Sequence, residues 1–238
     1  TTRNDFSQSG SVYDLLLFDD ITYGEVGYFT LRADVRNYLG VRNLTGTQVT
    51  GRFVPDHFAL VNGTVSVTND AQWNGNFVYM DQAKITVDYL LEAQNSNSVL
   101  TQNYNDINGF APATISPTAE NNDDGNDLSA RVVPGIFGTW SKGQMIFTQD
   151  NILFSRTTVP DGVFSSLKIG LKLNDQESAV DIPLLALDSN ATIAGACNPL
   201  SSCDAKSLGA SIDVRYGRMA IDNAYGSELL PLNMPLYI

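Results

Sequence analysis

Histidine is almost absent from the sequence, and this narrows the catalytic chemistry that the chain can support. The single histidine, His57, stands beside the end of an apolar stretch. A histidine-dependent nucleophile would need this one side chain next to a serine or cysteine and oriented by a carboxylate. The sequence has no Gly-x-Ser-x-Gly motif, which marks the nucleophilic serine of many hydrolases. We therefore expect His57 to be structural and hydrogen-bonded to nearby groups.

Basic side chains are also scarce, because 14 Lys and Arg stand against 26 Asp and Glu, giving a net charge of −12. This balance repels phosphate backbones and anionic lipid surfaces, so nucleic-acid binding and electrostatic membrane binding are disfavoured. Glycine-rich phosphate loops of the Gly-x-Gly-x-x-Gly or Gly-Lys-Ser/Thr kind are missing. No apolar run approaches the ~20 residues that span a bilayer, so we expect no direct membrane insertion.

What the sequence does contain is a series of short segments with the pattern of β-strands. Residues 29–36 alternate apolar and polar side chains throughout, which is typical of a strand with one wet face. Turn clusters such as Asn62-Gly63 and Pro160-Asp161-Gly162 separate the segments. The pattern predicts an all-β fold, an immunoglobulin-like β-sandwich. The expected strands lie within residues 14–18, 28–36, 65–68, 77–79, 84–92, 144–147, 152–155, 167–173, 211–215 and 218–221.

A faint internal repeat suggests that the sandwich consists of two units. Residues 51–56 and 217–222 share the form Gly-Arg-apolar-x-x-Asp. Read as a true repeat, it divides the chain into a smaller β unit, residues 1–60, and a larger β-sandwich with long loop insertions, residues 61–238. The alternative is that short strand motifs recur by chance.

The two cysteines, Cys197 and Cys203, flank a segment with Asn-Pro and two serines. Such residues favour turns that bring chain ends together, so the spacing predicts a disulfide and with it an oxidising compartment. A zinc or Cys-x-x-Cys redox site is disfavoured because the spacing is wrong. The alternative is a pair of reduced structural thiols.

Calcium is the one cofactor that the sequence leaves open. Residues 120–125 resemble the start of an EF-hand loop, but Arg131 stands where that loop needs a glutamate. A simpler oxygen cage would still suit Ca²⁺, which accepts irregular ligands, and residues 174–177 form a second, weaker acidic cluster. The alternative is a solvated acidic turn. The candidate ligands are Asp123, Asp124 and Asp127.

Two tryptophans, Trp73 and Trp140, stand in turn-rich stretches. An exposed indole could stack on the apolar face of a sugar ring, so both are candidate glycan-binding residues. The alternative is that each tryptophan anchors the core of the sandwich.

Several segments in order resemble the C-terminal region of MshQ-type proteins, which belong to the biogenesis cluster of the mannose-sensitive haemagglutinin (MSHA) pilus, a type IV pilus. Members often carry cysteines near the segment that matches residues 76–79, and this chain has none there. Cys197 and Cys203 are therefore its only candidates for covalent bracing. The similar segments are residues 23–29, 51–58, 77–82, 103–105, 160–162, 167–171 and 216–232.

The resemblance implies an exported protein of the bacterial cell surface, pilus or periplasm, with other pilus or envelope proteins as partners. It offers no catalytic motif to carry over, so we expect no enzymatic activity and no catalytic residues. Our first hypothesis is a structural or adhesive interaction module acting in pilus biogenesis or surface attachment, with partner contacts on long loops. The second is a lectin-like module that binds surface glycans, with calcium as an aid. An enzyme acting on envelope polysaccharide ranks third, since it would need two convergent carboxylates in a cleft.

Overall fold

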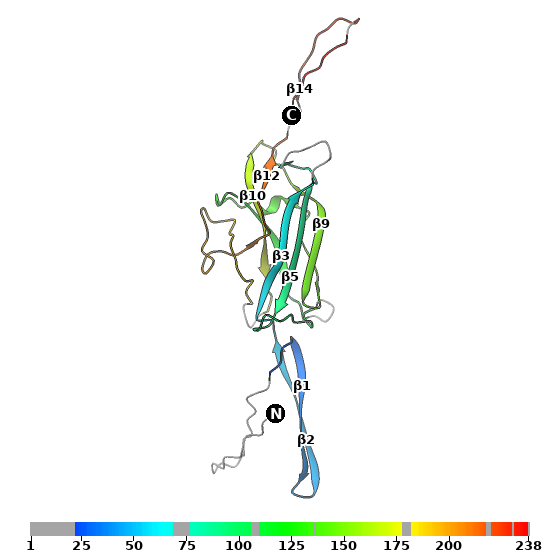
Figure 1. Cartoon of the computed structure of the whole chain (residues 1–238), viewed down its shortest axis with the longest axis vertical. Helices are drawn as coiled ribbons and strands as arrows, with labels where there is room; N and C mark the ends of the chain where they lie inside the picture. The colour runs from blue at the N-terminus through cyan, green and yellow to red at the C-terminus, as the bar shows by residue number, and fades with distance from the viewer. Residues whose placement is uncertain are drawn as a thin grey trace.

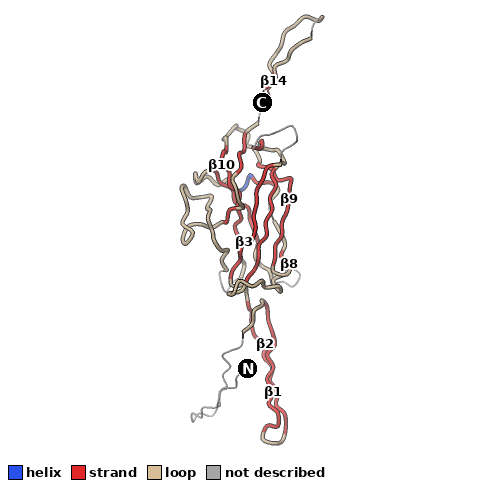
Figure 2. The backbone as a smooth tube through the Cα atoms, in the orientation of Figure 1, coloured by secondary structure: helices blue, strands red, loops and turns tan. Residues whose placement is uncertain are grey.

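The structure is a computed structural model that describes residues 22–68, 77–105, 110–135, 137–177, 182–217, 220–229 and 231–237. Its regular secondary structure is almost entirely β, and the described residues include one short 3-10 helix, η2 (Ser129–Arg131) (Figure 2). No helix in these ranges is long and apolar enough to cross a membrane. The strands form two five-stranded sheets and two two-stranded ribbons, so the predicted all-β sandwich is confirmed.

The first sheet is built around β5 (Ile85–Gln94), whose alternating sequence dictates its two faces. Every second side chain from Ile85 to Ala93 is buried, while those between are partly exposed. All pairings in this sheet are antiparallel. The strand order is β3 (His57–Val67), β5, β9 (Gln144–Phe154) and β7 (Val132–Val133), and β8 (Trp140–Ser141) also pairs with β9.

The second sheet is centred on β10 (Phe164–Asn174), which buries Leu167, Ile169 and Leu171. One edge of β10 pairs with β6 (Thr114–Asn121) over eight positions. Side chains from both sheets belong to one buried apolar cluster, so the sheets pack face to face. On the other edge of β10 lie β11 (Lys206–Ser207) and β12 (Ile212–Arg215), and β12 runs parallel to β4 (Phe77–Tyr79).

Three aromatic side chains fill one end of the core. Phe58, Tyr104 and Trp140 have ring centroids 5.0–5.5 Å apart in tilted and edge-to-face arrangements. Trp140 Nε1 donates to the Ala113 carbonyl at 2.8 Å, and the Tyr104 hydroxyl accepts from the Ala113 N–H at 3.0 Å. Both polar ends of the cluster therefore hold the same residue of the loop between β5 and β6.

The two ribbons project from opposite ends of the sandwich, as Figure 1 shows. At one end β1 (Gly27–Tyr38) pairs with β2 (Arg42–Phe53), and at the other β13 (Ala220–Ile221) pairs with β14 (Leu236–Tyr237). The boundary predicted after residue 60 falls inside β3, which pairs with β5 from His57 to Val67. The division into two units stays a prediction.

The predicted disulfide is confirmed, because Cys197 and Cys203 are bonded with their Cα atoms 5.1 Å apart. The Asn198 carbonyl accepts the backbone N–H groups of Ser201, Ser202 and Cys203 at 2.9–3.1 Å, so the loop is also tied internally. The short loop is thus a local brace on the long segment between β10 and β11.

Burial of two tyrosines makes the stability of the fold sensitive to alkaline pH. Removal from water raises the pKa of Tyr89 to about 12 and raises the pKa of Tyr104 as well. Above pH 10 the unfolded chain therefore loses these protons before the folded chain does. We expect the free energy of unfolding to fall by about 1.4 kcal/mol per pH unit for each tyrosine, from pH 10 toward 12.

Urea unfolding at a series of pH values measures this slope. Tyr89→Phe should make the decline shallower, whereas Tyr225→Phe should leave it unchanged because Tyr225 is 90% exposed. An equal slope in the wild type and Tyr89→Phe would contradict the assignment.

Candidate functional site

The β1–β2 ribbon has one apolar and one polar face, and both are open to solvent along most of its length. The register places Leu31, Val35 and Leu44 on one face, with Val35 directly opposite Leu44. On the other face Arg32 and Thr45 both donate to the Asp34 carboxylate, at 3.1–3.2 Å and 2.6 Å. Within the described part of the chain, each strand pairs only with the other, so both outer edges are unpaired.

A tight turn closes the far end of the ribbon and exposes apolar side chains. Gly40 adopts a positive φ of 72°, which a glycine accepts without strain. Its N–H donates to the Asn37 carbonyl at 3.0 Å, and Asn43 Oδ1 accepts the Asn37 N–H at 3.1 Å. Beside this glycine, Leu39 and Val41 are 81% and 83% exposed. The tip thus presents an apolar surface that nothing in the described chain covers.

The base of the ribbon is held by contacts to the body. The Glu25 carboxylate accepts the backbone N–H groups of Gln102 and Asn103 at 3.1 and 3.0 Å, both in the loop between β5 and β6. Arg52 forms an ion pair with Glu177 and lies over the Phe110 ring at 5.4 Å. An isolated two-stranded ribbon is only marginally stable in water, so these contacts should determine whether it stays ordered.

Aromatic rings line a hollow where the ribbon meets the body. Tyr23, Phe29 and Phe53 have ring centroids 4.8–5.6 Å apart. Together with Leu31 and Thr50 they surround a hollow of about 250 Å³. The hollow continues the apolar face of the ribbon and favours an apolar group of a partner over a charged one.

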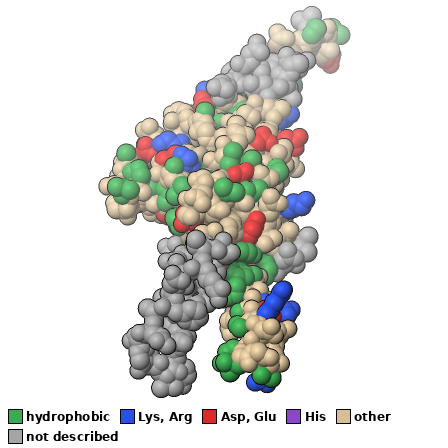
Figure 3. Space-filling model, turned by 60° about the horizontal axis from the view of Figure 1, so that its bottom comes forward, with side chains coloured by type: hydrophobic (Ala, Val, Ile, Leu, Met, Phe, Trp, Pro, Cys, Tyr) green, Lys and Arg blue, Asp and Glu red, His purple; other side chains and the backbone are tan. Residues whose placement is uncertain are grey.

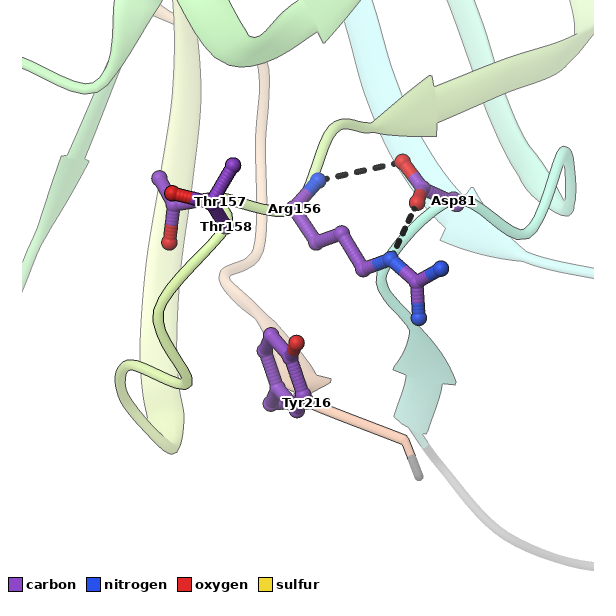
Figure 4. Close-up of a pocket in the computed structure, with 5 residues that line it drawn as sticks. All are labelled: Asp81, Arg156, Thr157, Thr158 and Tyr216. Carbon is purple, nitrogen blue, oxygen red and sulfur yellow. Dashed lines mark hydrogen bonds and ion pairs between the residues drawn. The ribbon is translucent and has the colours of Figure 1, made fainter. Parts of the chain in front are cut away.

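A second, polar hollow of about 510 Å³ lies at the opposite end of the sandwich (Figure 4). Arg156 Nε pairs with Asp81 at 2.8 Å, and the Arg156 N–H also donates to Asp81 at 3.1 Å. The guanidinium carbon lies 5.9 Å from the centre of the Tyr216 ring. Thr157 and Thr158 complete the lining. A ring face beside hydroxyl, carboxylate and guanidinium groups suits a polar ligand with some apolar surface.

Trp140 does not occupy the exposed position expected of a sugar-stacking residue. It is 2% exposed, and its ring packs against Phe58 and Tyr104 in the core. The turn after β8 packs closely against the loop that follows β5, because a Cβ on Gly143 would stand 2.5 Å from the Thr101 carbonyl oxygen. The other candidate, Trp73, lies outside the described residues.

The three candidate calcium ligands do not converge. Asp123 pairs with Lys168 at 2.6 Å, Asp124 accepts the Asn126 N–H at 2.8 Å, and Asp127 accepts the Ser129 N–H at 2.9 Å. In the ranges that the structure describes, no three His, Cys, Asp or Glu side chains are grouped to hold a metal ion. The carboxylates stabilise the turn and tie it to β10, and a calcium site at these residues stays a prediction.

His57 takes part in a local hydrogen-bond network. Nδ1 lies 2.8 Å from Asp56 and Nε2 lies 3.1 Å from Gln94, and the residue is 7% exposed. In the weaker acidic cluster, Glu177 pairs with Arg52, and burial raises the pKa of the Asp175 carboxyl. Glu177 thus joins the body to the ribbon through Arg52, and the Asp175 carboxylate accepts the Glu177 N–H at 3.2 Å.

The polar hollow gave no signal in the sequence. Asp81 and Arg156 are separated by 75 positions, and Tyr216 comes from the end of β12. A signal did exist for the ribbon, in the alternation of residues 29–36, but alternation does not tell whether another layer covers the apolar face.

Comparison with known proteins places most of the chain in one family. Residues 25–204 match the family model described as DUF6701, third domain. No curated protein and no solved structure matches the chain. The matched range begins at Glu25, so it includes the base of the ribbon, the ribbon itself and the sandwich up to the disulfide.

Removing the Glu25 carboxylate should loosen the ribbon without unfolding the sandwich. Glu25→Ala leaves two backbone N–H groups without their acceptor, which costs about 1.5 kcal/mol or more. We expect amide hydrogen exchange in residues 28–52 to become about tenfold faster or more, while exchange in β5 and β10 is unchanged. Glu25→Gln keeps one acceptor oxygen and should show a smaller effect. Equal exchange in the wild type and Glu25→Ala would refute this anchoring role.

Proposed function

We propose that this chain, which belongs to the DUF6701 family and carries its third domain, is an interaction module and not an enzyme. We assign it to a bacterial type IV pilus system of the MSHA kind. It would act in pilus biogenesis or surface attachment, with other pilus or envelope proteins as partners. The observation that carries the proposal is the β1–β2 ribbon, an amphipathic element with unpaired edges held out from a rigid sandwich. Exposed edges and apolar faces of this kind are typical of protein–protein contact.

Two side chains that could take part in reactions, His57 and Arg131, serve the fold instead, which favours recognition over catalysis. His57 is held between Asp56 and Gln94. Arg131 pairs with Asp161 at 2.6 Å and lies 4.2 Å from the centre of the Phe154 ring, so it braces the sandwich.

Two further observations support the proposed location at the cell surface, in the pilus or in the periplasm. The Cys197–Cys203 disulfide suits an oxidising compartment. The segments that resemble MshQ-type proteins, such as residues 51–58, include the last three residues of β2 and the start of β3. The resemblance thus reaches the base of the ribbon to which we assign the contact.

Complementation in the bacterium that encodes the chain tests this function. The gene is deleted and restored as wild type or with residues 30–49 replaced by Asn-Gly, which shortens the ribbon at the facing pair Phe29 and Thr50. We expect the shortened form to accumulate normally but to lose most surface pili or most surface attachment. Asp150→Arg, an exposed substitution on β9, is the control. Normal piliation and normal attachment with the shortened ribbon would refute the proposal.

Glycan binding is the second candidate function, and the polar hollow favours it. The Tyr216 ring offers a stacking face, and Asp81, Arg156 and the two threonines supply donors and acceptors. In this candidate function the sugar site is the polar hollow and not Trp140, which is buried. Calcium would assist the binding of the sugar.

A glycan array with the wild type and Tyr216→Ala tests the lectin function. We expect loss of a stacking ring to weaken binding of any bound sugar about fivefold, because such contacts contribute about 1 kcal/mol. Tyr225→Ala is the matched control, since that ring is 90% exposed and outside the hollow. Repeating the array with chelator separates calcium-assisted binding from metal-free binding. A signal that persists in Tyr216→Ala would exclude this hollow.

A further inference from the structure

The far end of the β1–β2 ribbon combines exposed apolar side chains with positive charge. Leu39 and Val41 are more than four-fifths exposed, and two arginines, Arg36 and Arg42, flank them. Neither arginine forms an ion pair with any residue that the structure describes. Residues 27–53 contain four arginines and one aspartate, a net charge of +3 in a chain of net charge −12. In Figure 3 blue and green side chains gather on this ribbon. We call residues 36–42 the basic tip.

The ribbon at the opposite end carries the complementary properties. Its loop, residues 222–235, exposes Tyr225 by 90% and Leu229 by 85%. Asp222 and Glu228 lie in the same loop, and neither forms an ion pair within the described ranges. Residues 220–237 contain these two acids and no Lys or Arg, a net charge of −2. We call residues 222–229 the acidic tip.

The backbone of each ribbon can accept a further strand. Both outer edges of the β1–β2 ribbon are unpaired in the described structure. Among the described residues of loop 222–235, the one backbone–backbone hydrogen bond joins the Asp222 N–H to the Pro235 carbonyl at 3.1 Å. A loop with unpaired backbone groups can add to an exposed strand edge, with side-chain contacts giving specificity.

We propose that the basic tip of one copy binds the acidic tip of a second copy, so that the chains assemble head to tail. Three features fit this occupant: opposite net charge, apolar side chains at both tips, and the position of the tips at opposite ends of the long axis (Figure 1). After the contact forms, the first copy keeps a free acidic tip and the second copy keeps a free basic tip. The contact is therefore heterologous and generates open linear chains, not closed dimers.

An anionic membrane is a poorer occupant for the basic tip than a second copy. The apolar and arginine side chains of this tip would suit a lipid surface, but the rest of the chain carries a net charge of −15 and would be repelled by it. A membrane would also leave the acidic tip without a function. The inference goes beyond the proposed pilus function, because its partner is a second copy of this chain. Self-association can therefore be tested on the purified chain alone.

Sedimentation velocity across a range of protein concentrations tests the proposal through a charge exchange. The wild-type chain should sediment faster as concentration rises, and added salt should reverse the shift. Arg36→Glu with Arg42→Glu places acids at both tips, and Asp222→Arg with Glu228→Arg places arginines at both tips. Each double variant alone should associate at least about tenfold more weakly than wild type. An equimolar mixture should recover association, because each variant then meets a tip of opposite charge.

Two controls keep the result specific. Asp150→Arg reverses an exposed charge in the middle of β9 and should associate as wild type does. Leu39→Ser with Val41→Ser should weaken association without changing any charge. Circular dichroism confirms that each variant is folded.

Several outcomes would overturn the proposal. These are a wild-type chain that stays monomeric at every concentration, double variants that associate like wild type, and a mixture that does not recover. Flotation of the wild type with vesicles of anionic phospholipid, without self-association, would assign the basic tip to membranes instead. Loss of pili in the shortened-ribbon strain together with a monomeric wild-type chain would retain the pilus function and reject self-assembly.

Discussion

The attachment of the β1–β2 ribbon depends on how the aromatic cluster of Phe58, Tyr104 and Trp140 holds Ala113. Trp140 donates a hydrogen bond to the Ala113 carbonyl, and the Tyr104 hydroxyl accepts one from the Ala113 N–H, inside an otherwise apolar core. An unpaired polar group there would cost about 1–3 kcal/mol, so the loop between β5 and β6 has little freedom to move. That loop supplies the N–H groups bound by Glu25. The aromatic cluster in the core thus fixes the loop, and the loop fixes the base of the ribbon through Glu25.

Among the described residues, several charged side chains of the body are paired, whereas those of the basic tip are not. In the body, Arg131, Lys168 and Arg215 pair with carboxylates and so contribute to the fold. The arginines of the basic tip have no such partner in the described structure. Surface ion pairs contribute little stability individually, whereas unpaired charges of one sign on a protruding element direct the approach of a partner. The ribbon geometry supports the binding role that we propose for this domain.

Local patterns in the sequence predicted the fold well and the surfaces poorly. The strand expected within residues 84–92 identified β5, because residues 85–89 alternate and a strand with one buried face leaves a period of two in the sequence. The Cys197–Cys203 bond was predictable because turn residues lie between the two cysteines. The sequence left Trp140 open between a sugar-stacking role and a core role, because its turn-rich surroundings hid the two-residue strand β8 that carries it into the core. Asp81, Arg156 and Tyr216 meet only through the packing of the sheets, which no local pattern reveals.

The way in which Glu25 anchors the ribbon has a consequence for how the domain tolerates sequence drift. Its partner at position 102 contributes only a main-chain N–H group, whereas Asn103 also donates from its side chain to the Val26 carbonyl at 3.5 Å. Any amino acid except proline supplies a main-chain N–H group, so position 102 can change freely while the attachment survives. Selection should therefore act on Glu25 and Asn103, and homologous chains that keep a ribbon should vary at position 102.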